Sequence, residues 1–400
     1  MSDREGISII IPTYNGGRVF SESIEKISQQ EYPGPVQLIV IDSGSIDGTK
    51  EIARGAGAVV IEIEKNAFRH GRTRNMALAF AEFDKVVYMV QDAIPFSRTL
   101  LSDLNRAILE NNVSAVYTRQ VPLDDANLFA RFELQSLEDF MGEDPVIQHI
   151  KSAESFYKMT YEEAYRAIRL DNVCAIYRKE ALKRHAFPDM DFAEDMAWAL
   201  EVLLVGHRVM YQPSIKVKHS HNRSPEYGFR RQIVNSKACA QIMGRVRDDL
   251  SFLTLRDLAV LTSRFQAFRK ELRAEITQQA VHPRDEGEKA ESGIEGVARR
   301  ILFEARKRKG SFEVSPDNPG ELSDEGRTLE EQAKDHIRNC LRSIQENHEA
   351  ELEYERPQVI EQLIANTLGR LYGEAYASRV LRGAMSQSFE DFISQFLEGV

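Results

Sequence analysis

A short segment at residues 40–48, with the sequence V-I-D-S-G-S-I-D-G, constrains the fold more than any other part of the chain. An apolar run ends there in Asp42 and is followed by S-G-S, which predicts a buried strand that stops at a polar turn. Two further runs end in the same way, I-S-I-I-I-P-T-Y-N at residues 7–15 and V-V-Y-M-V-Q-D-A at residues 86–93. Because ligands of open α/β sheets bind at the carboxyl ends of strands, these three ends predict a pocket at one sheet edge.

Strand-like and helix-like segments alternate along the first part of the chain. We expect strands at residues 7–11, 37–41, 58–63, 85–90 and 114–118. We expect helices between them at residues 19–30, 47–56, 73–83 and 98–111. Repeated β-α-β units imply a mostly parallel sheet with right-handed crossovers and flanking helices, an α/β fold.

Composition excludes several classes of protein. The chain has 400 residues, enough for two domains, and 42% of them are hydrophobic, enough for a packed interior. The formal net charge of −10 argues against a nucleic-acid partner, because phosphates require a basic face. The three cysteines lie far apart and form neither a disulfide framework nor a zinc-site spacing. No signal-peptide pattern or run of about 20 apolar residues is found, so we expect a cytoplasmic protein with at most peripheral membrane contact.

The composition also changes along the chain. We expect residues 1–244 to form the α/β domain, with a helical insertion at residues 128–170 beside the pocket. We expect residues 245–400 to form an α-helical region with charged linkers near residues 279–296 and 307–326, which are rich in Gly, Pro and Ser.

The last predicted helix, F-E-D-F-I-S-Q-F-L at residues 389–397, has its apolar residues on one face. We favour docking of this face on the protein's own core. The alternatives are a dimer seam, which would give a homo-oligomer through the C-terminal helices, and a membrane-surface helix. Glu390, Asp391 and Glu398 would be repelled by anionic lipid, which counts against the last alternative.

Five segments, in their order and spacing, resemble the inverting glycosyltransferases of family 2, which have the GT-A fold. They are I-S-I-I-I-P-T-Y-N, V-I-D-S-G-S-I-D-G-T, H-G-R-T-R-N, V-Q-D-A-I-P and F-A-E-D, within residues 7–244. F-R-H-G-R-T-R-N, Q-D-A-I-P and H-S-H further resemble the bacterial rhamnosyltransferase-like branch. This resemblance implies transfer of a sugar, with rhamnose as the candidate, from a UDP- or dTDP-sugar to a glycan or lipid-linked acceptor. It also implies polysaccharide or lipopolysaccharide biosynthesis at the inner face of the membrane, with residues 128–170 on the acceptor side.

The residues expected to hold the donor follow the strand ends or begin a helix. Asp42 would accept hydrogen bonds from the base or ribose, or would instead cap the turn that follows it. Tyr14 would stack on the base or pack half-buried. Arg74 would bind phosphate or ribose from the start of a helix, or make a surface ion pair. Arg230 and Arg231 would bind phosphate or form a solvated basic face. The expected donor-binding residues are Pro12, Thr13, Tyr14, Asn15, Asp42, Ser43, Gly44, His70, Arg74, Asn75, Gln91, Asp92, Ala93, Arg230 and Arg231.

The resemblance also implies a metal site with Mg²⁺ or Mn²⁺ as cofactor. The family's Asp-x-Asp motif is reduced here to Gln91-Asp92-Ala93, so only Asp92 is acidic. We expect Asp92 and His219 to hold the ion, with His221 as the alternative helper, because oxygen ligands suit these hard cations and related enzymes use a late histidine. Weaker metal dependence is the other outcome of the missing acid.

The F-A-E-D segment supplies the expected catalytic group. Asp195 would act as the general base that removes the acceptor proton, and the start of a helix would favour its ionised form. Glu194 would orient the acceptor. Trp198 would offer an apolar platform for a sugar ring or pack in the core.

Two other functions compete with transfer. A sugar nucleotidyltransferase also uses an open α/β sheet, but its glycine-rich basic loop after the first strand is absent, since the chain has P-T-Y-N-G-G-R there. A non-catalytic scaffold agrees with the incomplete metal motif. It is opposed by the retention of acids at three strand or helix ends, Asp42, Asp92 and Asp195.

Overall fold

The computed structural model describes residues 6–279, 294–307 and 320–397, which form two compact units. The first unit comprises the described residues of Met1–Ala126 and Glu133–His221, and the second comprises those of Asn127–Phe132 and Asn222–Val400.

The division between the units lies near His221, whereas we expected the first region to extend to residue 244. Most of each expected linker, at residues 279–296 and 307–326, lies outside the described residues. The expected helical insertion at residues 128–170 contains three helices and one short strand.

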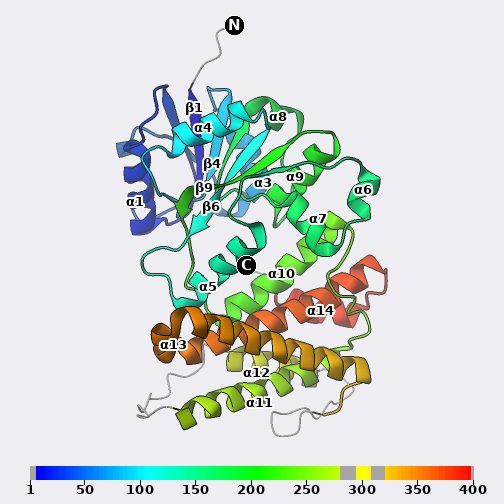
Figure 1. Cartoon of the computed structure of the whole chain (residues 1–400). Coiled ribbons are helices and arrows are strands. Elements are labelled where there is room, and N and C mark those ends of the chain that lie inside the picture. Colours follow the sequence, from blue (N-terminus) through cyan, green and yellow to red (C-terminus); the bar gives the residue numbers. More distant parts are fainter. Residues whose placement is uncertain (1–5, 280–293, 308–319, 398–400) are drawn as a thin grey trace. The chain divides into compact units, whose positions relative to one another are not determined.

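The first unit contains a mixed nine-stranded sheet with helices packed on it (Figure 1). Its strands are β1 (Ile7–Thr13), β2 (Val36–Asp42), β3 (Val59–Glu62), β4 (Lys85–Met89), β5 (Ile94–Pro95), β6 (Ala115–Val121), β7 (Val146–Gln148), β8 (Cys174–Arg178) and β9 (Val209–Lys218). The strand order is β3-β2-β1-β4-β8-β6-β9-β5, and β7 pairs with β9. Parallel pairing, which we expected for most of the sheet, occurs in β3-β2-β1-β4 and between β6 and β9. The other pairings are antiparallel: β8 pairs with β4 and with β6, and β9 pairs with β5 and with β7.

Helices of the first unit cover both faces of this sheet. They are α1 (Gly17–Ser28), α2 (Thr49–Gly55), the 3₁₀ helix η1 (Lys65–Ala67), α3 (His70–Leu78), α4 (Leu100–Glu110), α6 (Ala153–Tyr157), α7 (Tyr161–Ile168), α8 (Lys179–Arg184) and α9 (Glu194–Leu204). Helix α5 (Leu128–Met141) begins in the second unit and ends in the first. Side chains alternate along a strand. Val87 and Met89 therefore join the apolar cluster of α1 and α4, whereas Tyr88 joins aromatic rings on the other face, Tyr177 and Phe187.

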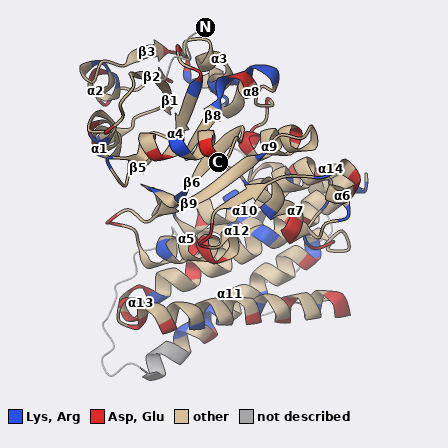
Figure 2. Ribbon diagram, turned by 45° about the horizontal axis from the view of Figure 1, so that its top comes forward, with Lys and Arg blue, Asp and Glu red and all other residues tan. Residues whose placement is uncertain are grey.

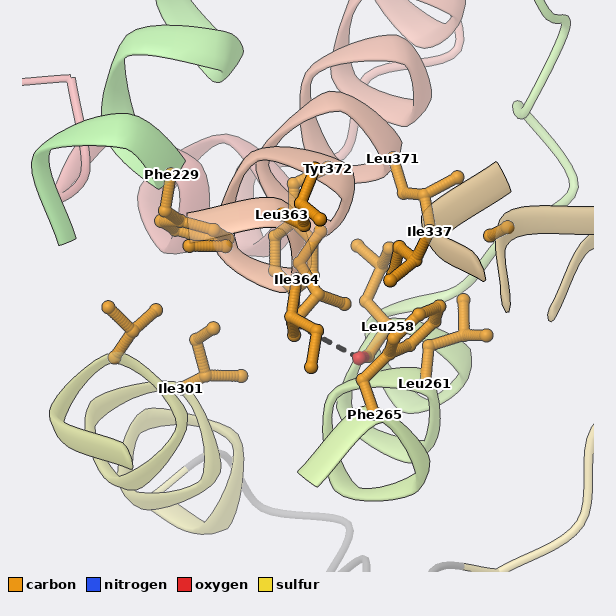
Figure 3. Close-up of a cluster of buried hydrophobic side chains, with 14 of the residues drawn as sticks. Phe229, Leu258, Leu261, Phe265, Ile301, Ile337, Leu363, Ile364, Leu371 and Tyr372 are labelled. Atoms are coloured by element: carbon orange, nitrogen blue, oxygen red, sulfur yellow. Dashed lines mark hydrogen bonds between the residues drawn. The ribbon is translucent and has the colours of Figure 1, made fainter. Parts of the chain in front are cut away.

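The second unit is helical and has its own hydrophobic core (Figure 3). Its helices are α10 (Pro225–Met243), α11 (Leu255–Gln279), α12 (Ile294–Lys307), α13 (Asp324–Leu381) and α14 (Gln387–Ser394). In Figure 3, Phe229 of α10, Phe265 of α11 and Ile301 of α12 surround side chains of α13 such as Ile364. The buried Tyr372 hydroxyl of α13 donates a hydrogen bond to the Leu258 carbonyl oxygen at 3.0 Å. Acidic and basic residues are interspersed along α11 and α13 (Figure 2).

Two glycines allow α10 and α13 to pack closely. A Cβ atom at Gly369 would lie 2.2 Å from the Phe229 carbonyl oxygen, and one at Gly373 would lie 2.7 Å from the Ser236 Cβ. The long α13 is interrupted at His348, where φ is −145° and ψ is 44°, so it is two helical segments joined by a kink.

The apolar face of α14 is buried within the second unit. Phe389, Phe392, Ile393 and Phe396 all belong to its core, so docking on the protein's own core is confirmed as the role of this face. None of the helices in the described part of the chain is long and apolar enough to span a bilayer.

Candidate active site

A pocket of about 380 Å³ lies at the carboxyl ends of β1, β2 and β4 in the first unit. Parallel pairing aligns these ends, because Thr13 of β1 lies opposite Asp42 of β2. The pocket is lined by residues at or just after the ends of the three strands and by residues of η1, α3 and the segment between them. They are Pro12, Thr13, Tyr14, Ser43, Lys65, Phe68, His70, Arg74, Val90, Gln91 and Asp92. The three polar strand ends found in the sequence are therefore brought together as expected.

Asp42 is fully buried and does not line the pocket. Its Oδ1 accepts hydrogen bonds from the Gly44 and Ser45 N–H groups at 3.0 and 2.8 Å, and its Oδ2 accepts one from the Thr13 hydroxyl at 3.1 Å. Gly44 has a φ of +94°, a conformation that glycine adopts without strain. The turn-capping alternative thus describes Asp42, which holds the loop of Ser43 against the end of β1.

Gln91 joins the ends of β4 and β1. Its Oε1 accepts a hydrogen bond from the Tyr14 N–H at 2.8 Å, and its amide donates to the Tyr14 carbonyl oxygen at 3.3 Å. An ionised aspartate could not donate to that carbonyl oxygen. The glutamine in the reduced Gln91-Asp92-Ala93 motif therefore fixes the backbone of Tyr14, whose ring lines the pocket.

Lys65 and Phe68 line the pocket beside Tyr14 and His70 but were missed from the sequence. The Lys65 ammonium donates a hydrogen bond to the Tyr14 hydroxyl at 3.0 Å and lies 4.3 Å from the centre of the Tyr14 ring. Phe68 packs edge-on against His70, with ring centres 4.9 Å apart. Aromatic faces beside a cation suit a ligand with both a flat ring and an anionic group.

Arg74 forms a buried ion pair rather than a surface one. Its Nη1 lies 2.5 Å from Oε1 of Glu194, and both side chains are almost fully buried. The same Glu194 oxygen accepts a hydrogen bond from the Asn172 amide at 3.2 Å. Among the described residues, the buried Arg74 Nε has no hydrogen-bond partner, although Arg74 lines the pocket. A ligand oxygen would satisfy this N–H.

Asp92, His219 and His221 form a cluster that could hold a cation. Oδ1 of Asp92 lies 3.6 Å from Nε2 of His219, and Oδ2 lies 3.6 Å from Nδ1 of His221. The ligand atoms of the three residues all lie within 4.8 Å of one another. These separations are too long for hydrogen bonds, but they leave room for an ion bonded to all three residues. Two imidazoles and a carboxylate fit Mn²⁺ better than Mg²⁺, which favours oxygen ligands.

Asp195 lies in the first turn of α9. Its Oδ2 accepts a hydrogen bond from the Asn172 N–H at 3.0 Å, and its Oδ1 accepts one from the Met196 N–H at 2.9 Å. Burial and the neighbouring Glu194 charge raise the pKa of Asp195 to about 6, although Arg74 and these N–H groups oppose the shift. The expectation that the helix start would favour the ionised form was therefore incomplete, because desolvation and like charge dominate. The group is still largely ionised at neutral pH.

Comparison with known proteins identifies the family. The profile of the family described as "Glycosyl transferase family 2" matches residues 8–186. The O-antigen chain rhamnosyltransferase WbaN of Salmonella anatum is 33% identical over 227 residues, which cover 56% of this chain and 69% of the relative. The chain belongs to glycosyltransferase family 2.

The rhamnosyltransferase-like branch is supported by a second relative. The O-antigen chain rhamnosyltransferase RfbN of Salmonella typhimurium is 33% identical over 230 residues, again 56% of this chain and 69% of the relative. The glycosyltransferase has a GT-A-like fold, with a mixed sheet flanked by helices and additional C-terminal helices. Among solved structures it is similar to the mannosyltransferase PcManGT from Pyrobaculum calidifontis, in complex with GDP-Man and Mn²⁺. That similarity has a TM-score of 0.45 at 18% identity and covers 91% of this chain and 86% of the other.

A polar network that contacts His219 of the Asp92, His219 and His221 cluster was also missed from the sequence. Gln120 connects His219 to Asp171, and Arg169 Nη2 lies 3.2 Å from Oδ2 of Asp171. Burial raises the pKa of the Asp171 carboxyl, while the Arg169 charge lowers it. Asp171 immediately precedes Asn172, whose N–H donates to Asp195. The one available sequence signal was the pair of polar residues just before the apolar strand β8.

Trp198 and Glu194 are both buried. Trp198 is fully buried, packs against Tyr177 and Phe187, and donates its indole N–H to the His185 carbonyl oxygen at 2.7 Å. The core-packing alternative is therefore correct, and the ring offers no exposed platform. Glu194 is buried and contacts Arg74 and Asn172, and its expected role in orienting the acceptor stays a prediction.

Several expected donor-binding residues lie outside the lining of the pocket. Asn15 accepts a hydrogen bond from the Ile46 N–H, and Asn75 makes hydrogen bonds with the Phe187 backbone. Ala93 is buried, and its carbonyl oxygen accepts a hydrogen bond from Ser23. These residues, like Gly44, shape the loops around the pocket.

The two arginines expected to bind the donor belong to the second unit. Both lie on α10, and Nε of Arg230 donates a hydrogen bond to the Phe396 carbonyl oxygen at 3.2 Å. The donor-binding role of Arg230 and Arg231 stays a prediction.

Proposed function

We propose that this glycosyltransferase is an inverting enzyme that moves a hexose, with rhamnose as the candidate, from a UDP- or dTDP-sugar to a hydroxyl of a glycan or lipid-linked acceptor. The observation that carries the proposal is one pocket whose lining joins an aromatic and cationic wall, a buried arginine and Asp92, which also belongs to the cluster with His219 and His221. The names of the two Salmonella relatives, both O-antigen chain rhamnosyltransferases, support the choice of sugar.

The nucleotide would occupy the wall formed by Tyr14 and Lys65. Tyr14 is 38% exposed and its ring can stack on a base, and the Lys65 ammonium beside it can donate to a base carbonyl or a phosphate. The unpartnered Nε of Arg74 would donate to the diphosphate or ribose. Asp42 would contribute indirectly by holding the Ser43 loop.

Asp92, His219 and His221 would hold a divalent cation, with Mn²⁺ favoured over Mg²⁺ by the two imidazoles. When bound, such an ion supplies positive charge that stabilises the diphosphate leaving group. The residues themselves bring one negative charge to a pocket edge that otherwise carries Arg74 and Lys65.

Asp195 would be the general base. Its carboxylate takes the proton of the acceptor hydroxyl as that oxygen bonds to the anomeric carbon, and the bond from this carbon to the diphosphate oxygen breaks. Attack from the face opposite the leaving group inverts the anomeric centre. Asp195 lies close enough to Arg74 for that cation to lower its pKa, which supports a position beside the donor pocket. The acceptor side at residues 128–170 and a location at the inner membrane face stay predictions from the family resemblance.

Calorimetry with UDP-, dTDP- and GDP-sugars, with and without Mn²⁺, tests the donor assignment. We expect binding of a UDP- or dTDP-sugar that is strengthened by Mn²⁺ and weakened by Tyr14→Ala. Ile46→Ala is the matched control, because Ile46 is 92% exposed and does not line the pocket. Preference for GDP-sugars, or equal affinity in Tyr14→Ala and wild type, would contradict the proposal.

A further inference from the structure

A chain of hydrogen bonds leads away from the cluster of Asp92, His219 and His221 within the first unit. Nδ1 of His219 lies 2.8 Å from Oε1 of Gln120, and Nε2 of Gln120 lies 3.1 Å from Oδ2 of Asp171. Asp171 is held in turn by the Arg169 guanidinium at 3.2 Å and by the Val173 N–H at 3.3 Å. His219 and Asp171 are thus connected through a single amide group.

The chemistry of these groups fixes the direction of each hydrogen bond. A carboxylate only accepts, so the amide N–H₂ of Gln120 must face Asp171. The amide oxygen of Gln120 then faces His219 and also only accepts, so Nδ1 of His219 must carry the proton. In the neutral ring, Nε2 then bears the lone pair, and Nε2 is the atom that lies 3.6 Å from Asp92.

We propose that Gln120 and Asp171 are positioning residues that fix His219 as its Nδ1–H tautomer and so direct the Nε2 lone pair toward the cation site. The cation role of His219 rests on the proposed function above, but the tautomer does not. Neither positioning residue touches the pocket, since neither is among the residues that line it.

Substitution of either residue removes one step of this chain. Gln120→Met keeps the size of the side chain but cannot accept the Nδ1 proton. Asp171→Asn replaces an obligate acceptor with an amide that can also donate, so the Gln120 amide can invert. In both variants His219 is free to adopt the Nε2–H tautomer that histidine prefers in water, and that tautomer cannot bind a metal through Nε2.

Two measurements on the full chain test the inference. Two-bond ¹H–¹⁵N spectra of protein labelled at histidine, recorded without metal, report the tautomer of His219, whose signals are assigned by their loss in His219→Gln. Titration with Mn²⁺ alone, followed by electron paramagnetic resonance, reports cation affinity. We expect Nδ1–H in wild type, an increased Nε2–H population in both variants, and Mn²⁺ affinity reduced about 10- to 100-fold. Gln212→Met is the control, because Gln212 lies on β9, the strand that ends just before His219. Its His219 tautomer and its Mn²⁺ affinity should match those of the wild type.

The outcomes separate the two claims. An Nε2–H tautomer in wild type, or unchanged tautomers in both variants, would overturn the positioning role. If the tautomers shift as expected but the wild-type protein does not bind Mn²⁺, the positioning role stands and the cation site of the proposed function fails.

Discussion

Asp195 carries the proposed proton transfer, and its surroundings set the pH at which it can act. Because burial and Glu194 raise its pKa to about 6, kcat/KM should fall about tenfold per unit as the pH drops below that value and the base becomes protonated. Glu194→Gln removes the like charge and leaves the Arg74 cation unneutralised. Both effects lower the pKa of Asp195, so the acid limb should move to lower pH. A limb that stays in place or moves to higher pH in a pH–rate profile would contradict this prediction.

Asp42 affects the pocket through the loop it holds. Asp42→Ala leaves the Gly44 and Ser45 N–H groups without their acceptor and removes one of the two acceptors of the Thr13 hydroxyl, the other being the Ile41 carbonyl oxygen. The buried Ser45 N–H left unpaired costs about 1–3 kcal/mol. We expect weaker donor binding and a lower melting temperature together. Calorimetry and thermal unfolding of this variant, with Glu51→Ala on the exposed part of α2 as control, provide the check. Unchanged donor affinity would reject the role of the loop.

At the scale of elements, the strand ends of the first unit were predictable because they are local features. An apolar run followed by Asp, Ser and Gly encodes both the buried strand and its turn, and each of the five expected strands is found within three residues of its observed bounds. The pairing of β8 was not predictable. Its sequence fixes neither its direction nor its neighbours, which depend on long-range packing between β4 and β6.

The α10–α13 contact of the second unit depends on the small size of Gly369. A Cβ atom there would lie 2.2 Å from the backbone oxygen of Phe229, and the backbone cannot move aside as a flexible side chain could. We expect Gly369→Ala to lower the melting temperature, with a cost of about 1–3 kcal/mol. Gly55→Ala is the matched control, because nothing lies within 4 Å of a Cβ there. Equal melting temperatures for the two variants would contradict the close-packing account.

At the scale of the whole molecule, the family and the pocket followed from the sequence, while the side-chain network did not. Asp92 and His219 are 127 positions apart in the chain, and the family resemblance suggested that they meet. The buried ion pair of Arg74 and Glu194 left no sequence signal, since charged residues are most often exposed. The sequence also left open whether Trp198 packs in the core or faces the pocket, because that depends on how α9 packs on the rest of the first unit.

Cation binding should stabilise the folded protein as a whole. An ion that binds the folded state adds RT ln(1 + [L]/Kd), about 2.7 kcal/mol at 100 times Kd. We expect Mn²⁺ to raise the melting temperature of the wild type and to have little effect on Asp92→Asn. Asp124→Asn, an exposed aspartate paired with Lys218, controls for the loss of an acidic charge. Equal Mn²⁺ stabilisation of Asp92→Asn and wild type would reject the cation site.

The most direct test of the proposed mechanism compares donor binding with sugar transfer in Asp195→Asn. Asparagine retains one acceptor oxygen, for either the Asn172 or the Met196 N–H group, but cannot take a proton. We predict donor affinity close to wild type by calorimetry and a transfer rate reduced about 10²- to 10⁴-fold. Wild-type turnover by this variant would show that another group deprotonates the acceptor.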